Sequence, residues 1–448
     1  MSTVEYYDQK VETAHRDEIK KIQFQKLKEI LKKISNSSSS YNRRFVQYGI
    51  NDADIQSIDD LRKLPFTVKK DFEKDQEEHP PFGTYLTEPL ENYVQYHQTT
   101  GTTGKPLKFL DTKESWEWRK KVACHILKAA GVKKGDRVLL PFNFGPYTAF
   151  WVMYEGAYYL GNLVIPTGGW NSLQRLQCII DNQVAVIPIT PTYALNLADT
   201  AVKNHIDIFN SSVRILMLSG EPGAQIPAIK GKLENLWNAK CVDYIGMTEV
   251  GTWGFQCTEE PNGVHILESE FIGEVVDPET GVPVQEGDTG ELVLTNLGRS
   301  CMPAIRYRTG DLVKVKKGIC RCGRTFQVLE GGILGRKDDM MVIRGVNVFP
   351  NILIEVVESY VQAGDDYRIE AYKKGAVDEI MIKLELGNSE KREGIKQSIQ
   401  NNIRAKLNIR VDIEVVPAGV LPKSNYKTKH FVDRRREGNA ADGRFSAA

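Results

Sequence analysis

The segment Thr99–Lys105 is dense in glycine and threonine and ends in a lysine, a composition suited to binding a polyphosphate. Its glycines let the backbone approach phosphate oxygens, its hydroxyls can donate hydrogen bonds to them, and Lys105 can add a positive charge. No GK[ST] sequence follows a four-residue gap, so the segment is not a Walker A loop. A flexible surface loop has a similar composition, and the segment alone favours phosphate binding only by a small margin.

Four more segments follow in an order that makes the first one specific. They are Asp243–Glu249 (DYIGMTE), Tyr307–Leu312 (YRTGDL), Gly335–Asp339 (GRKDD) and Leu421–Lys427 (LPKSNYK). Together with the phosphate-loop segment they resemble, in order, the signatures of the adenylate-forming superfamily of acyl-CoA synthetases and adenylation domains. An ordered set spread over most of the chain is far more specific than a lone Gly-rich loop.

Further segments resemble the phenylacetate–coenzyme A ligase branch of this superfamily. The matching segments are Leu61–Lys69 (LRKLPFTVK), Ser219–Pro222 (SGEP), Ile343–Pro350 (IRGVNVFP) and Leu421–Ser424 (LPKS). The resemblance covers roughly residues 15–436. It implies an α/β fold, with a large N-terminal adenylation domain of several subdomains and a small, mobile α+β C-terminal domain.

The resemblance also implies an enzyme that uses ATP, Mg²⁺ and coenzyme A in two steps. The acid attacks the α-phosphate to give an acyl-adenylate and pyrophosphate, and a thiol then takes the acyl group and releases AMP. Negative charge builds during the attack, so cationic and amide donors must surround the phosphate. Thr248 is expected to donate to the α-phosphate and Glu249 to coordinate Mg²⁺.

The C-terminal segment offers several candidates for the catalytic lysine, namely Lys423, Lys427, Lys429 and His430. Aligning LPKSNYK with the family's LPRSxGK assigns the role to Lys427, with Lys429 as the fallback. A lysine there would stabilise the pentavalent phosphate and the attacking carboxylate as a point charge. The alternative is an ordinary basic tail.

The same comparison assigns the nucleotide contacts. Asp311 and Arg336 are expected at the ribose hydroxyls, since a carboxylate that accepts hydroxyls is a common device for ribose. Gly220 and Glu221, within the segment Ser219–Pro222, are expected to line the adenine. Asp338 matches the hinge about which the small domain rotates between the two steps. The full set expected at ATP is Thr99, Thr100, Gly101, Thr102, Thr103, Gly104, Lys105, Ser219, Gly220, Glu221, Pro222, Tyr244, Ile245, Gly246, Met247, Asp311 and Arg336.

Two positions depart from the family pattern. Ile245 stands where the family usually has an aromatic residue that stacks on adenine, and Tyr244 lies one position earlier. A one-residue shift in an extended segment turns a side chain to the opposite face, so the stacking contact is either lost or supplied by a reoriented Tyr244. Tyr426 replaces the glycine before the catalytic lysine, which makes that loop stiffer.

Three cysteines and one histidine form a candidate metal site: Cys257, His265, Cys320 and Cys322. A Cys₃His set with four protein ligands suits a structural Zn²⁺. The C-x-C spacing is tighter than usual, and reduced cysteines at turns beside an ordinary strand histidine fit the sequence equally well. The sequence therefore leaves zinc binding open.

An apolar pocket for the acid is expected near four residues: Phe144, Tyr147, Trp170 and Ile245. Pockets for aryl groups are apolar with few polar anchors, and no buried cation is evident for a second carboxylate. An aromatic monoacid is therefore favoured. Core packing explains any one of these aromatic side chains equally well.

The elements that must position these residues follow from hydrophobic periodicity. Residues 11–34 are predicted to form an amphipathic helix, within a helical N-terminal segment that spans 11–85. Short apolar runs alternate with helical patterns over about 92–289. This alternation predicts an α/β core with largely parallel strands.

The remaining boundaries complete the predicted domain organisation. A β subdomain is expected over about 290–335, so that the N-terminal adenylation domain spans 1–337. The pattern of strand, helix, two strands, helix and strand over 338–436 predicts a small α+β lid domain. The small, polar tail 437–448 is predicted to be disordered.

Composition restricts the partners. Lys+Arg number 59 against 58 Asp+Glu, which gives no electrostatic case for nucleic acid or an acidic membrane. No apolar stretch approaches the roughly 20 residues of a membrane-spanning helix. The N-terminus is polar rather than a secretory signal, and the seven cysteines do not suggest a disulfide scaffold, so a cytoplasmic location is expected. Homodimerisation is left open.

Three functions compete. The leading one is an aryl-acid–coenzyme A ligase. A second keeps adenylation but transfers the acyl group to a carrier protein or another nucleophile, because the adenylation motifs do not reveal the acceptor. A third is a non-catalytic nucleotide-binding protein on the same fold, supported only by Ile245 and Tyr426.

Overall fold

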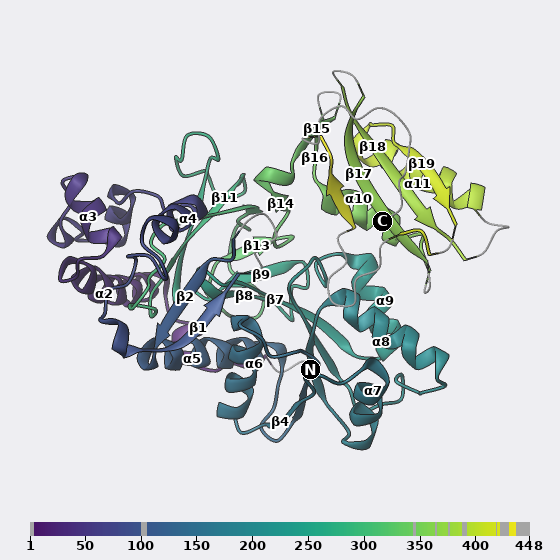
Figure 1. Cartoon of the computed structure of the whole chain (residues 1–448), viewed down its shortest axis with the longest axis horizontal. Coiled ribbons are helices and arrows are strands. Elements are labelled where there is room, and N and C mark those ends of the chain that lie inside the picture. Colours follow the sequence, from purple (N-terminus) through teal and green to yellow (C-terminus); the bar gives the residue numbers. More distant parts are fainter. Residues whose placement is uncertain are drawn as a thin grey trace.

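The structure is a computed structural model, and it describes residues 4–99, 105–343, 346–362, 365–374, 377–387, 392–417, 419–421 and 430–435. Helices at the N-terminal end, a large central sheet and smaller sheets make up the main body, and a C-terminal α+β part lies beside it (Figure 1). This mixed architecture confirms the predicted α/β class.

Helices form one end of the main body. Their bounds are α1 Gln9–Glu12, α2 Arg16–Ser35, α3 Ser40–Gln47 and α4 Lys69–Glu78, with 3₁₀ turns η1 Asp52–Asp54 and η2 Ile58–Lys63. The apolar residues of α2 recur at helical spacing and are buried along one face. The single helix predicted over residues 11–34 is divided in two, because the side chain of His15 caps a new helix by accepting from the Asp17 N–H.

An eight-stranded sheet forms the core, in the order β13-β9-β8-β7-β6-β5-β3-β4. Its strands are β3 Arg137–Leu140, β4 Leu163–Pro166, β5 Val186–Ile189, β6 Ile215–Leu218, β7 Lys240–Met247, β8 Gly251–Gln256, β9 Gly263–Ile266 and β13 Val328–Glu330. The strands from β4 to β7 run parallel, as the alternation predicts, and β8, β9 and β13 continue the sheet antiparallel. The accompanying helices are α5 Lys113–Ala130, α6 Thr148–Tyr159, α7 Ser172–Asp181, α8 Pro191–Lys203 and α9 Pro227–Trp237.

Two smaller sheets complete the main body. After the turn η3 Leu90–Asn92, strands β1 Tyr93–Gln98 and β2 Lys108–Thr112 form an antiparallel hairpin. A four-stranded sheet has the order β10-β11-β12-β14, built from β10 Phe271–Val276, β11 Thr289–Asn296, β12 Tyr307–Lys314 and β14 Gly335–Arg336. This sheet begins with β10, ahead of the start near residue 290 that the sequence suggested, because β10 pairs along its whole length with β11.

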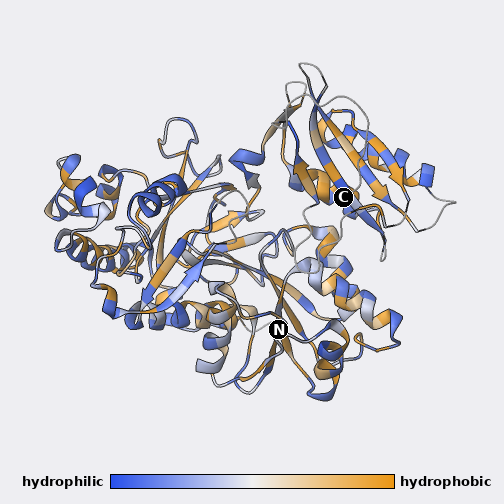
Figure 2. Ribbon diagram, viewed as in Figure 1, coloured by the Kyte–Doolittle hydropathy of each residue, from blue (hydrophilic) through white to orange (hydrophobic). Residues whose placement is uncertain are grey.

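The C-terminal part follows the turn η4 Lys337–Asp339. Its elements are β15 Met341–Ile343, β16 Val346–Val348, α10 Pro350–Glu358, β17 Asp366–Lys374, β18 Val377–Glu385, α11 Arg392–Leu407, β19 Asp412–Val416 and β20 Phe431–Asp433. Four strands form a sheet in the order β19-β18-β17-β20, while β15 and β16 pair separately as a hairpin. Hydrophobic residues follow the strands of this sheet and of the central sheet, whereas the N-terminal helices are largely hydrophilic on their outer faces (Figure 2).

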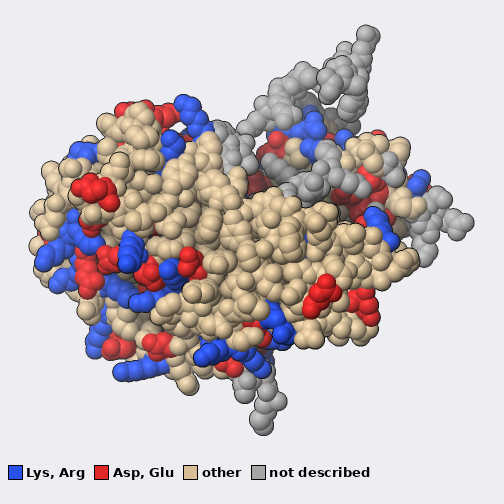
Figure 3. Space-filling view, turned by 60° about the horizontal axis from the view of Figure 1, so that its bottom comes forward, with Lys and Arg blue, Asp and Glu red and all other residues tan. Residues whose placement is uncertain are grey.

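The surface carries charges of both signs. On the face shown in Figure 3, lysines and arginines intermix with acids at one end, and a broad central area is free of charged side chains. At this end of the face, the two signs are intermixed rather than separated into blocks. Among the helices of the described chain, none combines the length and the apolar character needed to cross a membrane.

Candidate active site

The ends of the predicted phosphate loop are held together where this loop connects β1 to β2. Thr99 N donates to Leu107 O at 2.9 Å, and Leu107 N donates to the Thr99 hydroxyl at 3.0 Å. Lys105 Nζ lies 3.9 Å from Glu77 Oε1, and both side chains are largely exposed. Such an exposed ion pair stabilises the protein by less than about 1 kcal/mol, so Lys105 can leave Glu77 and bind a phosphate instead. The loop residues Thr100–Gly104 lie outside the described residues.

Thr248 and Glu249 occupy the turn between β7 and β8, and both are half-buried. Burial raises the pKa of the Glu249 carboxyl, and the positive charges of Lys69, Arg336 and Arg299 oppose this rise. Lys69 and Arg299 have no role in the sequence-based assignment. Lys69 could have been found from the sequence, because it ends the matched segment LPFTVK. No motif contains Arg299.

The predicted adenine segment Ser219–Pro222 follows the end of β6. Gly220 has a φ of +89°, a conformation that favours glycine. Glu221 Oε1 accepts a hydrogen bond from Thr192 N at 2.6 Å, which ties the segment to the first turn of α8. The backbone of the segment is therefore fixed before any nucleotide arrives.

Asp243 supports the same segment from β7. Its two carboxylate oxygens accept from Ala224 N and Gln225 N, each at 2.8 Å, and shape the turn that follows Ser219–Pro222. Burial raises the pKa of Asp243 to about 6. Sequence reasoning named Asp243 only as part of the motif DYIGMTE and gave it no role; an acid at the centre of an otherwise apolar strand was the available signal.

The other residues of that motif divide between the two faces of β7. Tyr244 is buried in the core, and burial raises the pKa of its phenol while Ser219 lowers it by hydrogen bonding. Ile245 and Met247, at alternate positions of the strand, are half-buried and pack against the same core. At Gly246, a side chain would collide with the backbone of β8. Tyr244 is thus placed beneath the adenine segment rather than stacked over it.

Asp311 and Arg336 lie directly opposite each other in the β12–β14 pair. Arg336 Nη1 donates to Asp311 Oδ1 at 3.1 Å and to Thr309 O at 3.2 Å. Burial raises the pKa of Asp311 to about 6, although the Arg336 charge lowers it. The structure therefore brings together the two residues that the sequence assigned to ribose, and at neutral pH the carboxylate is ionised and able to accept hydroxyl groups.

The predicted hinge lies directly after this pair. Asp338 is within the turn η4, and its largely exposed carboxylate lies 3.8 Å from Arg336 Nη2. Lys337 donates to Pro278 O at 3.0 Å and pairs with Glu279 at 2.8 Å. The residue before the predicted hinge is therefore tied to the main body, while the chain after it enters the C-terminal part.

The candidates for the catalytic lysine lie outside the described residues: Lys423, Lys427 and Lys429, together with Tyr426 and the tail 437–448. His430, the remaining competitor, is described. Its ring stacks on Tyr367 with centroids 4.3 Å apart, and its Nδ1 lies 3.1 Å from Tyr367 O. His430 is thus engaged within the C-terminal sheet, which favours a lysine for the catalytic role.

The aromatic residues proposed for the acid pocket differ in exposure. Phe144 is half-buried and packs edge-on against Trp151 and Tyr154, with centroids 4.9 and 5.9 Å apart. Tyr147 is 37% exposed, and Trp170 is 45% exposed and lines a shallow hollow beside α7. Phe144 therefore faces the protein interior together with Ile245, whereas Trp170 lies at the surface.

Comparison with known proteins identifies the family. The model for AMP-binding enzymes matches residues 49–302, and the model for the AMP-binding enzyme C-terminal domain matches residues 345–435. The phenylacetate–coenzyme A ligase of Escherichia coli (strain K12) is 32% identical over 434 residues, which cover 95% of this chain and 97% of the relative. The chain belongs to the AMP-binding enzymes. Within that family it falls in the phenylacetate–coenzyme A ligase branch, as the motifs indicated.

The arrangement of the two parts of this AMP-binding enzyme matches one state of a solved relative. A 2-hydroxyisobutyryl-CoA ligase in the postadenylation state, bound to an acyl-AMP, superposes with a TM-score of 0.89 at 26% identity, covering 96% of this chain and 93% of that one. The same ligase in its thioesterification state, aligned over the same 96% and 93% of the two chains, gives a TM-score of 0.73. The arrangement of the two parts is therefore closer to that of the postadenylation state.

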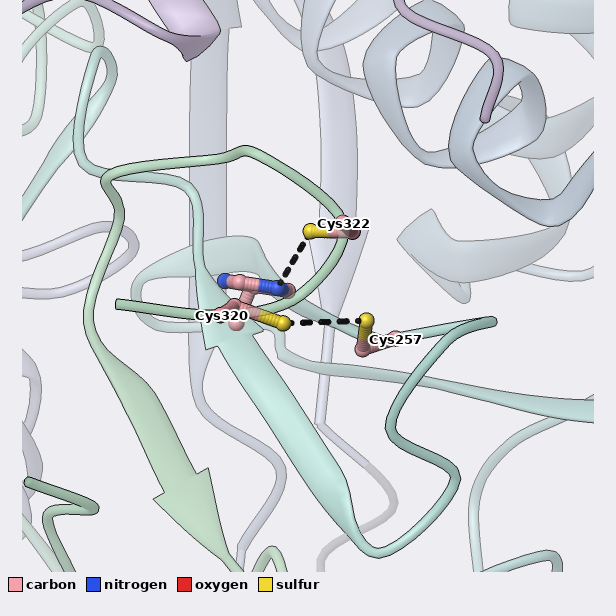
Figure 4. Close-up of side chains that lie close together, drawn as sticks. Cys257, Cys320 and Cys322 are labelled. Carbon is pink, nitrogen blue, oxygen red and sulfur yellow. Dashed lines mark hydrogen bonds between the residues drawn. The ribbon is translucent and has the colours of Figure 1, made fainter. Parts of the chain in front are cut away.

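The second predicted site of this AMP-binding enzyme is a buried Cys/His centre, formed by Cys257, His265, Cys320 and Cys322 (Figure 4). Their ligand atoms all lie within 4.8 Å of one another. Cys257 Sγ is 3.4 Å from Cys320 Sγ, and Cys322 Sγ is 3.3 Å from His265 Nε2. Tetrahedral zinc bonds place two sulfurs about 3.8 Å apart and a sulfur and a nitrogen about 3.6 Å apart. The two halves of the motif, which the sequence could not bring together, therefore meet at near-ligating distances.

The surroundings of the Cys/His centre orient its histidine. His265 Nδ1 lies 3.2 Å from Phe326 O, so that Nδ1–H can donate to this carbonyl while Nε2 is directed at Cys322. Such a backbone partner for the distal nitrogen is typical of metal-bound histidine.

The N-terminal segment, residues 4–14, covers the Cys/His centre. Tyr6 donates its hydroxyl hydrogen to Cys322 O, and Val4 packs against the cysteines. Arg324 Nε donates to Glu12 Oε2 at 2.7 Å, and both side chains are buried. The loop that carries two of the cysteines is thus fastened to the start of the chain.

Proposed function

We propose that this chain adenylates an aromatic monocarboxylic acid with ATP and transfers the acyl group to coenzyme A. It is an ATP-dependent, AMP-forming acid–thiol ligase, as are the named ligases that align with its full length. The observation that carries the proposal is the match to an acyl-AMP complex at a TM-score of 0.89, which reaches across both parts of the chain. The choice of an aromatic acid rests on the phenylacetate–coenzyme A ligases among the relatives.

The described residues supply most of the parts that adenylation needs. Asp311 and Arg336 would hold the ribose, and the fixed segment Ser219–Pro222 would line the adenine. Lys105, free to leave Glu77, would follow the outgoing phosphates. The contacts to ribose and adenine act on parts of ATP that do not react, so they position the α-phosphate for attack, whereas Lys105 would act on the leaving pyrophosphate.

Glu249 would hold Mg²⁺, which would neutralise negative charge on the phosphates when bound. A half-buried carboxylate with a raised pKa fits a hard divalent cation, because binding the cation removes the cost of burying the negative charge. Lys69 would face the same phosphates from the first turn of α4. Lys427 would place the charge that stabilises the pentavalent phosphate, as the sequence predicts.

Transfer to coenzyme A requires the C-terminal part to rotate. Asp338 would be the pivot, since the residue before it is tied to Pro278 and Glu279 while its own side chain is exposed. Transfer to a carrier protein stays the alternative for the second step.

The expectations of a homodimer and of a cytoplasmic location stay predictions, the latter supported by seven cysteines with no disulfide among them.

We also propose that the Cys/His centre binds a structural Zn²⁺. Three thiolates and one imidazole are a donor set that zinc prefers, and four protein ligands leave no open position for catalysis. The backbone bond of His265 supports the proposal, since it fixes the tautomer that a metal needs.

The proposed reaction can be tested on the full-length protein. The enzyme is incubated with ATP, Mg²⁺, coenzyme A and a pool of aryl and alkyl acids, and the products are read by mass spectrometry. We expect AMP and an aryl-CoA. The Lys427→Ala variant should form adenylate at least about 100-fold more slowly while it still binds AMP, because a transition-state charge is lost but not the nucleotide contacts. Lys406→Ala is the control, because Lys406 lies on α11 and pairs with Glu355.

Other products would redirect the proposal. AMP and acyl-adenylate without a thioester would move the acceptor to a carrier protein or another nucleophile. An aliphatic product alone would overturn the aromatic assignment. Nucleotide binding with no AMP from any acid would support the non-catalytic alternative.

A further inference from the structure

Three charged side chains form a buried network beside the turn that carries Glu249. Arg119 Nε donates to Asp111 Oδ2 at 3.0 Å, and Arg299 Nε donates to Asp111 Oδ1 at 2.7 Å. Asp111 and Arg299 are 0% exposed and Arg119 is 2% exposed. No motif contains these residues, and the proposed chemistry does not use them.

Arg299 uses its remaining nitrogens to join two parts of the candidate active site. Nη1 donates to Glu249 O at 3.1 Å, and Nη2 donates to Leu110 O at 3.1 Å. Leu110 and Asp111 belong to β2, the strand that leaves the phosphate loop. One guanidinium therefore sets the distance between the Glu249 turn and the base of that loop.

The charge of the network argues against a purely stabilising role. Two guanidinium groups face one carboxylate, and the ring of His97, opposite Phe109 in the hairpin, adds no charge because burial lowers its pKa to about 4. In the described chain, Arg119 Nη2 and both ring nitrogens of His97 have no hydrogen-bond partner. Burying ions in this way contributes little to stability compared with apolar side chains of the same size. What the network supplies is a fixed geometry, because each Asp111 oxygen accepts from one arginine and each Arg299 nitrogen donates to a defined oxygen.

We propose that Arg299, held in place by Asp111, is a positioning residue for the adenylation step. It fixes the turn of Glu249 relative to β2, so that the Glu249 carboxylate and the phosphate loop keep the separation that a magnesium-bound triphosphate requires. Arg299 touches neither the reacting atoms nor the nucleotide and acts through the backbone of Glu249. The proposal rests on the proposed function, in which Glu249 holds the magnesium ion.

Arg299→Lys tests the proposal, because lysine keeps the charge but cannot reach Asp111, Glu249 O and Leu110 O together. The matched control is Arg306→Lys. Arg306 is also buried, bonds Glu274 through two nitrogens at 3.0 and 2.9 Å, and donates to the backbone oxygens of Arg62 and Leu64. Both substitutions remove a buried guanidinium with a carboxylate and two carbonyl partners, but only Arg299 reaches the turn of Glu249.

Three quantities are measured on the purified variants: thermal unfolding, affinity for AMP and for ATP with and without Mg²⁺, and the rate of adenylate formation against Mg²⁺ concentration. We expect the two variants to unfold at similar temperatures. Arg299→Lys should require about 10-fold more Mg²⁺ for half-maximal rate and bind ATP with Mg²⁺ about 10-fold more weakly. Its affinity for AMP, which has neither the β- and γ-phosphates nor a need for Mg²⁺, should equal that of Arg306→Lys.

The outcomes separate the inference from the function on which it rests. An Arg299→Lys enzyme with the Mg²⁺ dependence of Arg306→Lys overturns the inference and leaves the ligase intact. Equal losses of AMP and Mg²⁺-ATP affinity also overturn it, because they indicate general damage. A wild-type protein that forms no adenylate contradicts the proposed function itself, while the Mg²⁺-dependent binding of ATP still tests the positioning role.

A second variant covers the case in which Arg299→Lys does not fold. Asp111→Asn keeps the shape of the network and leaves Arg299 free to bond Glu249 O, but it removes the charge that anchors both arginines. We expect the same change in Mg²⁺ dependence with a smaller size, about 3-fold. An unchanged Mg²⁺ dependence in folded Asp111→Asn would contradict the anchoring role of Asp111.

Discussion

At the Cys/His centre, four ligand atoms lie within 4.8 Å of one another, all four residues are buried, and a backbone carbonyl already orients the histidine. At the proposed nucleotide site, Glu249 and Asp311 belong to different sheets, Lys105 pairs loosely with Glu77 on the surface, and the predicted catalytic lysine would come from the C-terminal part. The four residues of the first site already lie together in the fold. The second depends on how several regions are placed.

This difference follows from what each site has to do. A structural metal needs a closed set of ligands, so a rigid, buried cluster serves it best. A nucleotide site must admit ATP, release pyrophosphate and later admit a thiol, so some of its groups must move. The Cys/His centre should therefore dominate stability, whereas the nucleotide site should respond mainly to pH and to the arrangement of the two parts.

Loss of metal from the Cys/His centre should give the largest effect. Cys257→Ser, or treatment with a chelator, should lower the free energy of unfolding by about 4 kcal/mol or more, the range in which loss of a bound metal falls. Residues 4–14 should then exchange amide hydrogens faster, because Tyr6 bonds Cys322 O in the intact centre. Calorimetry, hydrogen exchange and metal analysis of the purified protein measure these changes.

Cys178→Ser is the matched control for this prediction. Cys178 is also buried and free, but its sulfur contacts only the amide of Asn182 among the hydrogen-bonding groups described. We expect this variant to keep its metal and to lose no more than about 1 kcal/mol. The prediction would be contradicted if purified wild-type protein held no stoichiometric zinc. It would also be contradicted if Cys257→Ser and Cys178→Ser lowered the free energy of unfolding equally.

The nucleotide site should respond to pH through Asp311. Its folded-state pKa is raised from 3.8 to about 6 by burial, so the carboxylate that accepts ribose hydroxyls is lost as the pH falls through 6. The ionised fraction of Asp311 falls about 10-fold between pH 7 and pH 5, so AMP should bind up to about 10-fold more weakly at pH 5. The effect on stability has the opposite sign, because the folded state binds this proton more tightly than the unfolded chain. Ionisation of Asp311 thus lowers stability above pH 6, and the loss disappears toward pH 4.

Asp311→Asn separates this titration from that of Asp243, whose pKa is also raised to about 6. The variant should bind AMP at pH 7 about 10-fold or more weakly than the wild type. Its AMP affinity should vary with pH only as far as the titration of Asp243 causes. Isothermal titration at several pH values measures both. A variant with the wild-type slope would show that Asp311 does not face the ribose.

Sequence periodicity predicted the parts of the fold that depend on local pattern. Runs such as Val184–Ile189 and Ile215–Leu218 became buried parallel strands, because a strand covered on both faces must be apolar throughout. The division of the first long helix at His15 was missed, since a capping histidine is a weak signal beside a continuous apolar stripe. The membership of β10 in the four-stranded sheet was missed because strand pairing is not local.

The same distinction applies to the candidate site. Asp311 and Arg336 could be assigned from motifs, and the structure pairs them. Cys257 and Cys320 could be named but not joined, because no sequence pattern fixes the distance between segments so far apart. Arg299 could not be found at all, since its role depends on a hydrogen bond to the backbone of Glu249, which any residue type would offer.

The smallest effect should come from the contact between the two parts of the enzyme. Lys232 on α9 lies 3.7 Å from Glu358 on α10, and the Glu358 side chain is buried. Lys232→Ala should favour departure from the postadenylation-like arrangement and slow adenylation up to about 5-fold, since an ion pair with a partly exposed lysine contributes about 1 kcal/mol or less to the free energy. The thiol-transfer step, which uses another arrangement, should not slow.

Lys230→Ala provides the control, because Lys230 lies on the same helix and pairs with Glu234 within it. Single-turnover rates of the two half-reactions, measured separately for both variants, decide the outcome. Equal slowing of both steps by Lys232→Ala would indicate local damage to α9 rather than a shift between arrangements. Slowing of adenylation alone, with zinc content and unfolding temperature unchanged, would show that the nucleotide site depends on domain placement while the Cys/His centre does not.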